Sequence, residues 1–445
     1  MATEGHTQDA QIRLSENETA CRQSIQRNPA DAGAHFNLGS CLLKRGQIDE
    51  AISAWKVGLR LRPEIPEAYG SLADAYMRKE QFDDAIEAAR TAVRLKPDLA
   101  FAWNNLGAAL AAKTNIDEAI AAYRNAIGFK PDFAQAHWNL SLALLLRGDF
   151  AEGWEEYEWR FSMQDFPIPK FNFRQPRWRG EELAGRRILL YCEQGMGDAI
   201  QFVRYVPLVV ARGGRVVMVG PMELFTLLRS FPGVEEVVAP GPWPAFDVQC
   251  PLLSLPRIFR TRAESIPAPI PYIRPDPHRV QAWKDRFIGI AGKRNVGLAW
   301  AGRPNFGNDR NRSIALEQLS PLTAFNDIAF VSLQKGEAAK QAADMTLIDL
   351  TAELHDFADT AALIANLDLV ISVDTAVAHL AGAMGKPVWV LLPLAPDWRW
   401  RLNREDSAWY PSMRLFRQPS RRDWKTPIAA MSEAMKSVAK LQPNE

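Results

Sequence analysis

The arrangement of apolar and polar positions divides the chain into two parts. In the N-terminal third, apolar positions recur at helical spacing, and prolines stand 34 residues apart at Pro29, Pro63, Pro97 and Pro131. From about residue 186 onward, short apolar runs rich in β-branched residues alternate with helical patterns. We therefore expect an all-α repeat array followed by an α/β region.

The 34-residue interval is the period of tetratricopeptide repeats. Small and large residues recur at matching places in successive repeats: Leu38, Gly39, Ala51 and Trp55, then Tyr69, Leu72, Tyr76, Ala85 and Ala92, then Trp103, Leu106, Gly107, Ala119, Tyr123 and Ala126, and more weakly Leu140, Gly153 and Tyr157. We predict about four repeats within residues 1–165, with one further helix before Asn28.

Such an array usually offers a groove to a peptide or a partner protein. Asn37, Asn104, Asn105 and Asn139 fall on the first helices of their repeats, where amides can hold a peptide backbone, although a solvated polar face explains them equally well. The last repeat is unusually aromatic, with Trp154, Tyr157, Trp159 and Phe161. These rings either stack on a ligand or seal the array against the next domain. Residues 167–179 carry three prolines and no periodicity, so residues 166–185 are the expected linker.

The remaining chain predicts two lobes, at residues 186–285 and 286–445. Buried strands are expected at residues 187–191, 215–219, 237–238, 246–249, 295–300, 328–333, 347–350, 369–372 and 388–392. Strands that alternate with helices predict two doubly wound parallel sheets that face each other across a cleft. In such sheets, ligands bind at the carboxyl ends of the strands.

Candidate site residues follow one strand of each lobe. After residues 187–191 come Gln194, Gly195, Gly197 and Asp198, where the glycines allow a sharp turn and a close approach to a ligand. After residues 369–372 come Asp374 and Thr375, both good helix caps, and a helix over residues 376–384. Backbone N–H groups at the start of that helix favour an anion.

The string DTAVAHL, from Asp374 to Leu380, resembles the D-[ST]-G-x-x-H-L signature of bacterial heptosyltransferases, which are GT-B sugar transferases with nucleotide-diphospho-sugar donors. Ala376 replaces the usual glycine of that family, and an ordinary capped helix is the alternative interpretation. The pair Gly197-Asp198, followed by Pro207, also resembles the N-lobe of these enzymes, where the matching aspartate is regarded as the catalytic base. The resemblance implies that the final helix, over residues 426–441, packs back on the N-lobe.

A repeat array joined to a GT-B (twin Rossmann-like) module also resembles the general plan of O-linked N-acetylglucosamine transferases and of bacterial protein or flagellin glycosyltransferases. The fold expected from this resemblance is an N-terminal all-α superhelix followed by a two-lobed GT-B module, with the acceptor on the N-lobe and the nucleotide-sugar on the C-lobe.

For an inverting sugar transfer, Asp198 is the candidate base, although it also suits a helix cap. Thr375, with Lys335, Arg310 and Arg312, is the candidate set for the leaving diphosphate. We assign Gln334, Ala376 and His379 to the same donor site, although His379 suits a buried structural role equally well, and Asp374 either to the helix cap or to sugar hydroxyls. Residues 397–401 and 409–411 are aromatic and either stack on a base or sugar or brace the lobes. No metal-binding cluster is apparent, so we expect a metal-independent reaction without a cofactor.

The totals exclude some classes. The chain has 445 residues, a net charge of +1 and 47% hydrophobic residues, which disfavours a general nucleic-acid or membrane-surface role. Cys21, Cys41, Cys192 and Cys250 show no zinc spacing and suit a reducing compartment. No signal peptide or transmembrane run is evident, so a cytoplasmic protein is expected. The sequence predicts a glycosyltransferase whose repeats recruit a protein acceptor; the alternatives are a scaffold with an inactive module and a nucleotide-sugar sensor.

Overall fold

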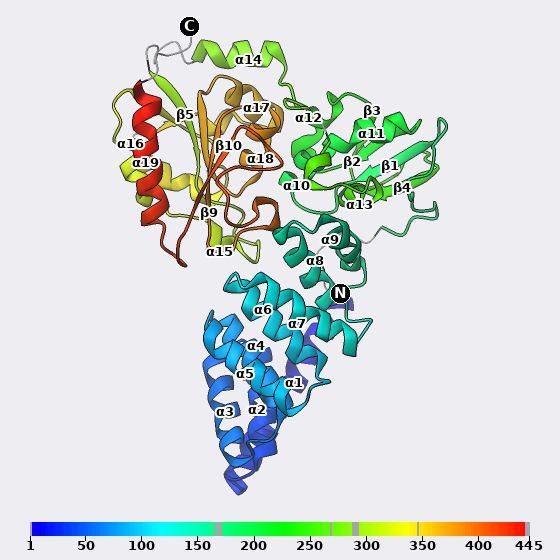
Figure 1. The fold of residues 1–445 in the computed structure, drawn as a ribbon, viewed down its shortest axis with the longest axis vertical. Helices are drawn as coiled ribbons and strands as arrows, with labels where there is room; N and C mark the ends of the chain where they lie inside the picture. Colours follow the sequence, from blue (N-terminus) through cyan, green and yellow to red (C-terminus); the bar gives the residue numbers. More distant parts are fainter. Residues whose placement is uncertain are drawn as a thin grey trace. The chain divides into compact units, whose positions relative to one another are not determined.

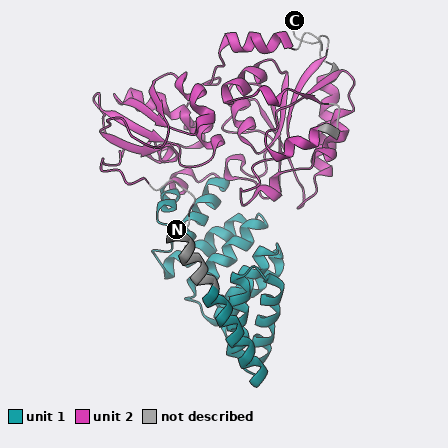
Figure 2. Cartoon of the chain, turned by 180° about the vertical axis from the view of Figure 1, so that it is seen from behind, with its two compact units in different colours: residues 1–147, 155–164 teal, residues 148–154, 165–445 magenta. Residues whose placement is uncertain are grey.

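The structure, a computed structural model, describes residues 2–163, 166, 171–267, 269–286, 293–344 and 347–440. It divides into two compact units: residues 1–147 with 155–164, and residues 148–154 with 165–445 (Figure 2). Of the predicted linker, residues 167–170 lie outside the described residues, as do residues 164–165 and 441–445 at the ends of the expected domains.

The first unit is a stack of paired helices (Figure 1). They are α1 (Ala2–Arg27), α2 (Ala32–Lys44), α3 (Ile48–Leu61), α4 (Pro66–Arg78), α5 (Phe82–Leu95), α6 (Ala100–Ala112), α7 (Ile116–Phe129), α8 (Ala134–Arg147) and the 3₁₀ turn η1 (Glu158–Phe161). Helix α9 (Phe150–Tyr157) is divided between the units, because residues 148–154 belong to the second. Each proline of the 34-residue series follows the end of a helix by one to three residues, because its ring cannot continue the hydrogen-bond ladder. The helical array agrees with the predicted repeat fold.

Small residues set the spacing within each helix pair. A Cβ built on Gly39 of α2 would lie 2.7 Å from the indole of Trp55 on α3, and one on Gly107 of α6 would lie 2.5 Å from the ring of Tyr123 on α7. These are the glycine and aromatic positions of the repeat pattern. Because each ring occupies the space that a Cβ would need, the paired helices pack closely and bury a continuous core.

The second unit contains two parallel sheets, as the alternation of strands and helices predicted. The N-lobe sheet has the order β3-β2-β1-β4, from β1 (Arg187–Tyr191), β2 (Arg215–Val219), β3 (Val234–Val238) and β4 (Val248–Pro251). Its register pairs Leu189 of β1 with Val217 of β2 and with Gln249 of β4. Its helices are α10 (Met196–Phe202), α11 (Val206–Ala211), α12 (Phe225–Arg229) and α13 (Leu255–Ile258).

The C-lobe sheet has the order β10-β9-β8-β5-β6-β7. Its strands are β5 (Arg294–Ala299), β6 (Ile328–Ser332), β7 (Ile348–Asp349), β8 (Leu369–Val373), β9 (Val388–Leu392) and β10 (Met413–Arg417). The helices are α14 (Pro277–Lys284), between the lobes in sequence, and α15 (Asp309–Arg312), α16 (Ser320–Thr323), α17 (Phe357–Ala365), α18 (Ala376–Ala383) and α19 (Lys425–Lys440). The sequence analysis did not predict β10.

Both sheets reverse their strand order beside a central strand. In the N-lobe the chain moves from β1 through β2 to β3 and then returns to β4 on the other side of β1. In the C-lobe it moves from β5 to β7 and returns to β8 on the other side of β5. Loops separate at such reversal points, so a ligand is expected at the carboxyl ends of β1 and β8.

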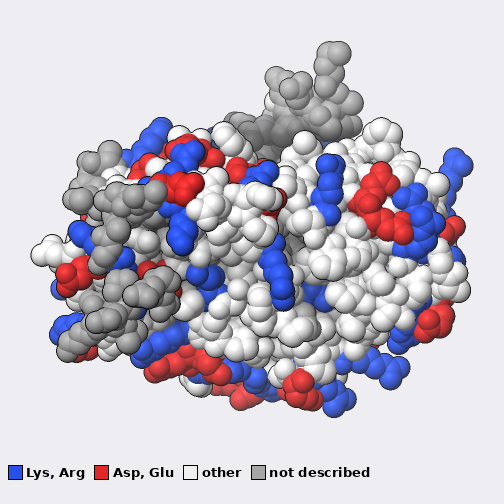
Figure 3. Space-filling view, turned by 90° about the horizontal axis from the view of Figure 1, so that it is seen from above, with Lys and Arg blue, Asp and Glu red and all other residues white. Residues whose placement is uncertain are grey.

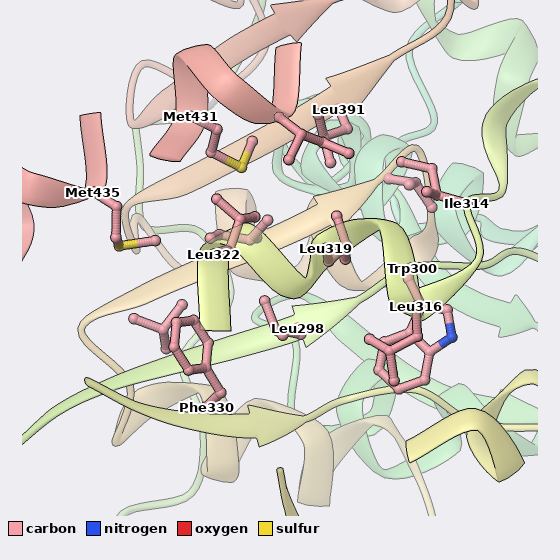
Figure 4. Packing of buried hydrophobic residues seen from close by; sticks show 14 of the residues in the cluster. Leu298, Trp300, Ile314, Leu316, Leu319, Leu322, Phe330, Leu391, Met431 and Met435 are labelled. Atoms are coloured by element: carbon pink, nitrogen blue, oxygen red, sulfur yellow. The ribbon is translucent and has the colours of Figure 1, made fainter. Parts of the chain in front are cut away.

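The final helix packs on the C-lobe, which corrects the expectation that it returns to the N-lobe. Ile428, Met431 and Met435 of α19 are buried in the C-lobe core with Leu298 and Phe330 (Figure 4). The helix also lies beside α16 (Figure 1). Its apolar spacing of three and four residues forms one stripe, and the short connection from β10 places that stripe over the nearest sheet.

Part of the predicted linker belongs to the N-lobe. Phe171 and Phe173 pack on a cluster of buried N-lobe side chains that includes Tyr191 and Phe246. The backbone N–H of Trp178 donates to Gln249 O at 2.8 Å, and Trp178 is 1% exposed. Residues 171–178 thus cover the sheet instead of forming an unpacked connection, because aromatic rings between the prolines gain free energy from burial.

Candidate functional site

The N-lobe half of the site is the turn from β1 into α10. Gly195 is the N-cap residue, and Asp198 is the third residue of α10. The Asp198 carboxylate accepts a hydrogen bond from the backbone N–H of Gly195 at 2.8 Å. One role that the sequence offered for Asp198 was the N-cap itself. In the structure Asp198 instead reaches back to the cap residue, Gly195, as in a capping box.

The two glycines of this turn have different roles. Gly195 has φ −70° and ψ 166°, which any residue adopts, so its backbone needs no glycine. Gly197 faces α18: a Cβ built on it would lie 2.8 Å from His379 Cδ2 and 3.5 Å from Ala376 Cα. Gly197 therefore allows a close approach of the other lobe, whereas the predicted approach to a ligand stays a prediction. Gln194, also assigned to this loop, is partly exposed beside Gly195.

The C-lobe half of the site is the turn from β8 into α18. Thr375 is the N-cap residue, but its side chain does not cap the helix; its hydroxyl lies 3.0 Å from Ser372 Oγ. The first N–H groups of an α-helix have no partner within the helix. Those at the start of α18 stand at the reversal point of the C-lobe sheet, where an anion is favoured.

His379 is buried between the lobes and is 5% exposed. Its ring stacks on Trp400 with centroids 5.3 Å apart, its Nδ1 lies 3.0 Å from the Tyr410 hydroxyl, and its Nε2 lies 3.9 Å from Asp374 Oδ1. Burial lowers the pKa of His379 well below its usual range, and the nearby arginines lower it further. The imidazole is therefore neutral at physiological pH and suits a hydrogen-bonding role at the junction.

Two carboxylates share this junction. The side chains of Asp198 and Asp374 are 18% and 15% exposed. Burial, opposed by Arg399, raises the pKa of Asp198. Burial and the neighbouring Asp397 raise the pKa of Asp374 to about 6. A carboxylate with a raised pKa is a better proton acceptor near neutral pH, as general-base chemistry requires.

The arginines proposed for the diphosphate lie on the loop after β5. Arg312 Nη1 donates to Asp374 O at 2.8 Å, and its Nε donates to Asp309 Oδ1 at 3.1 Å, so this side chain ties the loop to the end of β8. Arg310 is exposed on the same short helix, α15. Arg303, which the sequence analysis missed, is exposed and its Nη2 lies 3.7 Å from Met196 Sδ on the N-lobe. Arg303 and Arg310 are the exposed cations of this loop.

The side chains of Gln334 and Lys335 form hydrogen bonds with backbone groups of nearby segments. The amide of buried Gln334 accepts from the N–H groups of Trp300 and Ala301 at 2.9 and 2.8 Å and donates to the carbonyls of Ala301 and Lys335, each at 3.0 Å. Lys335 Nζ donates to Thr351 O at 2.7 Å and to Leu354 O at 3.0 Å. In this structure neither side chain is brought to Thr375; their proposed donor contacts remain predictions.

The aromatic run after β9 braces the lobes, one of the two roles expected of it. Trp398, Trp400, Trp409 and Tyr410 are each at most 3% exposed. Trp398 meets Phe202 of α10 with ring centroids 6.5 Å apart and Trp409 meets it at 5.7 Å. Within the same unit, Trp154 meets Trp398 at 5.2 Å, edge to face. Rings packed in this way leave no face open for a base or a sugar.

Groove amides of the repeat unit are engaged with one another and with backbone. Asn139 Nδ2 donates to Asn104 Oδ1 at 2.9 Å, and Asn105 Nδ2 donates to Gly70 O at 3.1 Å. Asn37 is exposed. Trp159, at the end of the unit, stacks on His137 with centroids 3.9 Å apart. The amides therefore link neighbouring repeats, and Asn37 is the exposed member of the set.

The surface outside the candidate site carries charges of both signs. On the face drawn in Figure 3, basic and acidic side chains are interspersed with uncharged ones. A cavity of about 680 Å³ lies between α11, α12 and the residues before α14, and one of about 430 Å³ lies between α14 and α17. Neither cavity is lined by Asp198 or Thr375.

Among the described residues, no group of three or more His, Cys, Asp or Glu side chains is placed to hold a metal ion. None of the helices in the described ranges is long and apolar enough to cross a membrane.

Comparison with known families finds the same two parts. Residues 331–397 match the profile described as glycosyltransferase family 9 (heptosyltransferase). Residues 44–100, 71–132 and 104–158 match one tetratricopeptide repeat profile, and residues 20–53 match another. The matched transferase segment contains β8, α18 and β9, and so the Asp374–His379 half of the site. The chain is therefore similar to tetratricopeptide repeat proteins over residues 20–158 and to glycosyltransferase family 9 over residues 331–397.

The chain is similar to Protein FlbA of Caulobacter vibrioides (strain ATCC 19089 / CIP 103742 / CB 15), with 32% identity over 326 residues. The alignment covers 66% of this chain and 54% of FlbA, so the chain spans about half the length of this relative. Among solved structures, MamA is 24% identical over 36% of this chain and 92% of its own, with a TM-score of 0.32. The first TPR of Spaghetti (RPAP3) bound to an HSP90 peptide is 28% identical over 25% of this chain and 89% of its own, with a TM-score of 0.25.

Proposed function

We propose that the second unit is an inverting glycosyltransferase that takes a nucleotide-diphospho-sugar donor. The observation that carries the proposal is the contact of α10 with α18 at Gly197, which places Asp198 beside the start of α18 at the reversal points of both sheets. One half of that junction lies in the segment that matches the transferase family. A diphosphate at the helix start and a base on the facing lobe are what sugar transfer requires.

The chemistry is a single displacement. An acceptor group attacks the anomeric carbon of the sugar, its proton passes to Asp198, and the bond from that carbon to the diphosphate oxygen breaks. The nucleoside diphosphate leaves with the bonding electron pair. Backbone N–H groups of Thr375 and Ala376, with Arg303 and Arg310 on the neighbouring loop, would stabilise its charge, so the proposal assigns no step to a metal.

The repeats supply the acceptor in this proposal. Tetratricopeptide arrays bind peptides or proteins along a groove, and the exposed Asn37 and the half-buried Trp159 and Phe161 of the last repeat are candidates for such a contact. This extends the general plan of the O-linked N-acetylglucosamine transferases to the present chain.

A binding-only role has one observation in its favour. Asp198 is ion-paired with Arg399, and α10 packs directly on α18, so the candidate base is engaged and little exposed. Ala376, in place of the family's glycine, also adds a methyl group where a phosphate would approach. A scaffold would bind no nucleotide-sugar, and a sensor would bind one without turnover.

Two measurements separate these functions. A thermal-shift screen with nucleoside diphosphates and their sugars detects a ligand that binds only the folded chain, since saturation at 100 times Kd stabilises it by about 2.7 kcal/mol. Release of nucleoside diphosphate in the presence of a cell extract then reports transfer. We expect both signals, and loss of the second in Asp198→Asn. Binding without release in any extract would favour the sensor, and no binding would favour the scaffold.

A further inference from the structure

Arg399 is a buried arginine that the sequence pattern did not single out as a site residue. It lies in the 3₁₀ turn η10 (Trp398–Trp400), after the carboxyl end of β9, and is 7% exposed. Its guanidinium carbon lies 4.3 Å from the centroid of the Trp398 ring and 5.8 Å from that of Phe202. A charge removed from water in this way is tolerated only where several acceptors surround it.

Those acceptors come from both lobes. Arg399 Nε donates to Gln201 Oε1 at 2.5 Å, and its Nη2 pairs with Asp198 Oδ1; both partners are on α10 of the N-lobe. Its Nη1 donates to Asp397 Oδ1 at 2.9 Å, in its own C-lobe turn. The planar fork of an arginine can reach three acceptors in fixed directions, which an ammonium group cannot.

The Asp198 carboxylate is held from two sides by this arrangement. Oδ2 accepts from Gly195 N–H, and Oδ1 meets the guanidinium. The first contact is local to α10 and survives any movement of the lobes. The second exists only while the C-lobe turn lies against α10.

We propose that Arg399 is a positioning residue: when the two lobes come together, it orients the Asp198 carboxylate and supplies its countercharge. Separation of the lobes removes the guanidinium from Asp198, and closure restores both its orientation and its countercharge. The proposal rests on the proposed function, in which Asp198 takes the acceptor proton. It predicts that closure of the two lobes around a donor also brings Asp198 into its catalytic orientation.

Several charged or titratable groups face Asp198 and set the expected directions. They are Arg399 of η10, its N-cap residue Asp397, and Cys192 after the end of β1. Asp374 and the neutral His379, on the C-lobe side of the junction, interact with Arg399. Among the shifts acting on Asp198, Arg399 lowers the pKa and Asp397 raises it. Removing one or the other charge therefore moves the pKa of Asp198 in opposite directions.

The test compares full-length Arg399→Gln, Arg399→Lys and Asp397→Asn variants. Titration of ¹³C-carboxyl-labelled aspartate, with the Asp198 signal assigned by its absence in Asp198→Asn, measures the pKa directly. We expect a higher midpoint in Arg399→Gln, a midpoint near the wild-type value in Arg399→Lys, and a lower midpoint in Asp397→Asn. Arg404→Gln is the control, because Arg404 pairs with Asp406 on the same lobe away from Asp198.

Turnover kinetics give a second measurement: a purely structural role of Arg399 would not lower kcat while leaving the donor KM unchanged. For Arg399→Gln we expect kcat to fall about 10²-fold, with the donor KM unchanged, because misplacement of a catalytic group by about 1 Å has an effect of that size. Arg399→Lys should restore the acid limb of the pH profile but only part of kcat. An unchanged midpoint in Asp397→Asn, together with full turnover of Arg399→Lys, would overturn the proposal even if Arg399→Gln does not fold.

The two proposals fail in different ways. If the wild-type chain releases no nucleoside diphosphate with any donor, the proposed function is wrong, yet the titration midpoints still measure whether Arg399 controls Asp198. If the wild-type chain is active and the midpoints do not move, the role of Arg399 is wrong and the transferase assignment stands.

Discussion

A Cβ added to Gly197 on α10 would lie 2.8 Å from Cδ2 of His379 on α18, although the two residues are 182 positions apart in the sequence. Real Cβ atoms essentially never come so close to a neighbour. The absence of a side chain at Gly197 is therefore what lets the two lobes touch where their sheets end.

Gly197→Ala should separate α10 from α18. Within a helix this substitution normally stabilises by about 0.5–1 kcal/mol, so a loss would have to come from the contact. We expect a net loss of about 1–3 kcal/mol in the free energy of unfolding, as for other overpacked sites. Urea unfolding measures it. Gly128→Ala, inside α7, is the matched control, because nothing lies within 4 Å of a Cβ there; equal behaviour of the two variants would contradict the account.

Asp198→Asn tests the base. Asparagine has a single acceptor oxygen, so it keeps the bond from Gly195 N–H but turns an NH₂ group toward Arg399, which retains Asp397 and Gln201 as acceptors. We therefore expect a loss of about 1–3 kcal/mol in the free energy of unfolding. Loss of the proton acceptor should reduce turnover by roughly 10²–10⁴-fold. Donor consumption at saturating acceptor measures this. Full activity of the folded variant would remove Asp198 from the mechanism.

Gln334→Ala separates a structural role from a donor contact. The side chain satisfies four backbone groups at the ends of β5 and β6, and its removal leaves buried donors unpaired at about 1–3 kcal/mol each. We expect a large loss of stability in denaturant unfolding. Gln318→Ala, at an exposed position, should stay within about 0.5 kcal/mol. A stable Gln334→Ala chain with weakened nucleotide binding would favour the donor role predicted from the sequence.

Asp374 should make stability fall as the pH rises. Its folded pKa of about 6 exceeds the ordinary value of 3.8, so the folded state holds the proton more tightly. The favourable contribution is complete below the unfolded pKa and is lost as the pH rises through about 6. Between pH 5 and pH 8, linkage gives a loss of about 1.4 kcal/mol relative to Asp374→Asn. Urea unfolding of both chains at the two pH values measures it; parallel pH profiles would exclude the raised pKa.

The local pattern of apolar and polar residues was sufficient to predict the helices and strands at the site. The apolar runs of β1, β2 and β9 begin and end where the sequence placed them, because buried parallel strands are continuous runs bounded by polar or turn residues. The 34-residue proline interval likewise identified the repeats. Strand β10 was missed because Met413–Arg417 (MRLFR) includes two arginines and no more than two consecutive apolar residues, a weaker signal than a continuous apolar run.

Contacts between residues that are far apart in the sequence could not be predicted from local sequence patterns. The amphipathic stripe of α19 shows that the helix is half-buried but not which sheet covers it. Arg399 meets Asp198 across about two hundred residues of chain, so neither sequence neighbourhood indicates the pair. Gln334 and Lys335 follow a strand, where a ligand contact is plausible, but nearby backbone groups occupy them instead.

The most direct test of a shared donor site is isothermal titration of the full chain with nucleoside diphosphates. We expect one molecule per chain for at least one nucleotide, with affinity kept in Asp198→Asn, since the base does not touch the leaving group. Ala376→Asp should weaken that binding at least tenfold, because it places a carboxylate at the first position of α18 beside the diphosphate. Binding that Ala376→Asp leaves unchanged, or no binding of any nucleoside diphosphate, would contradict the account.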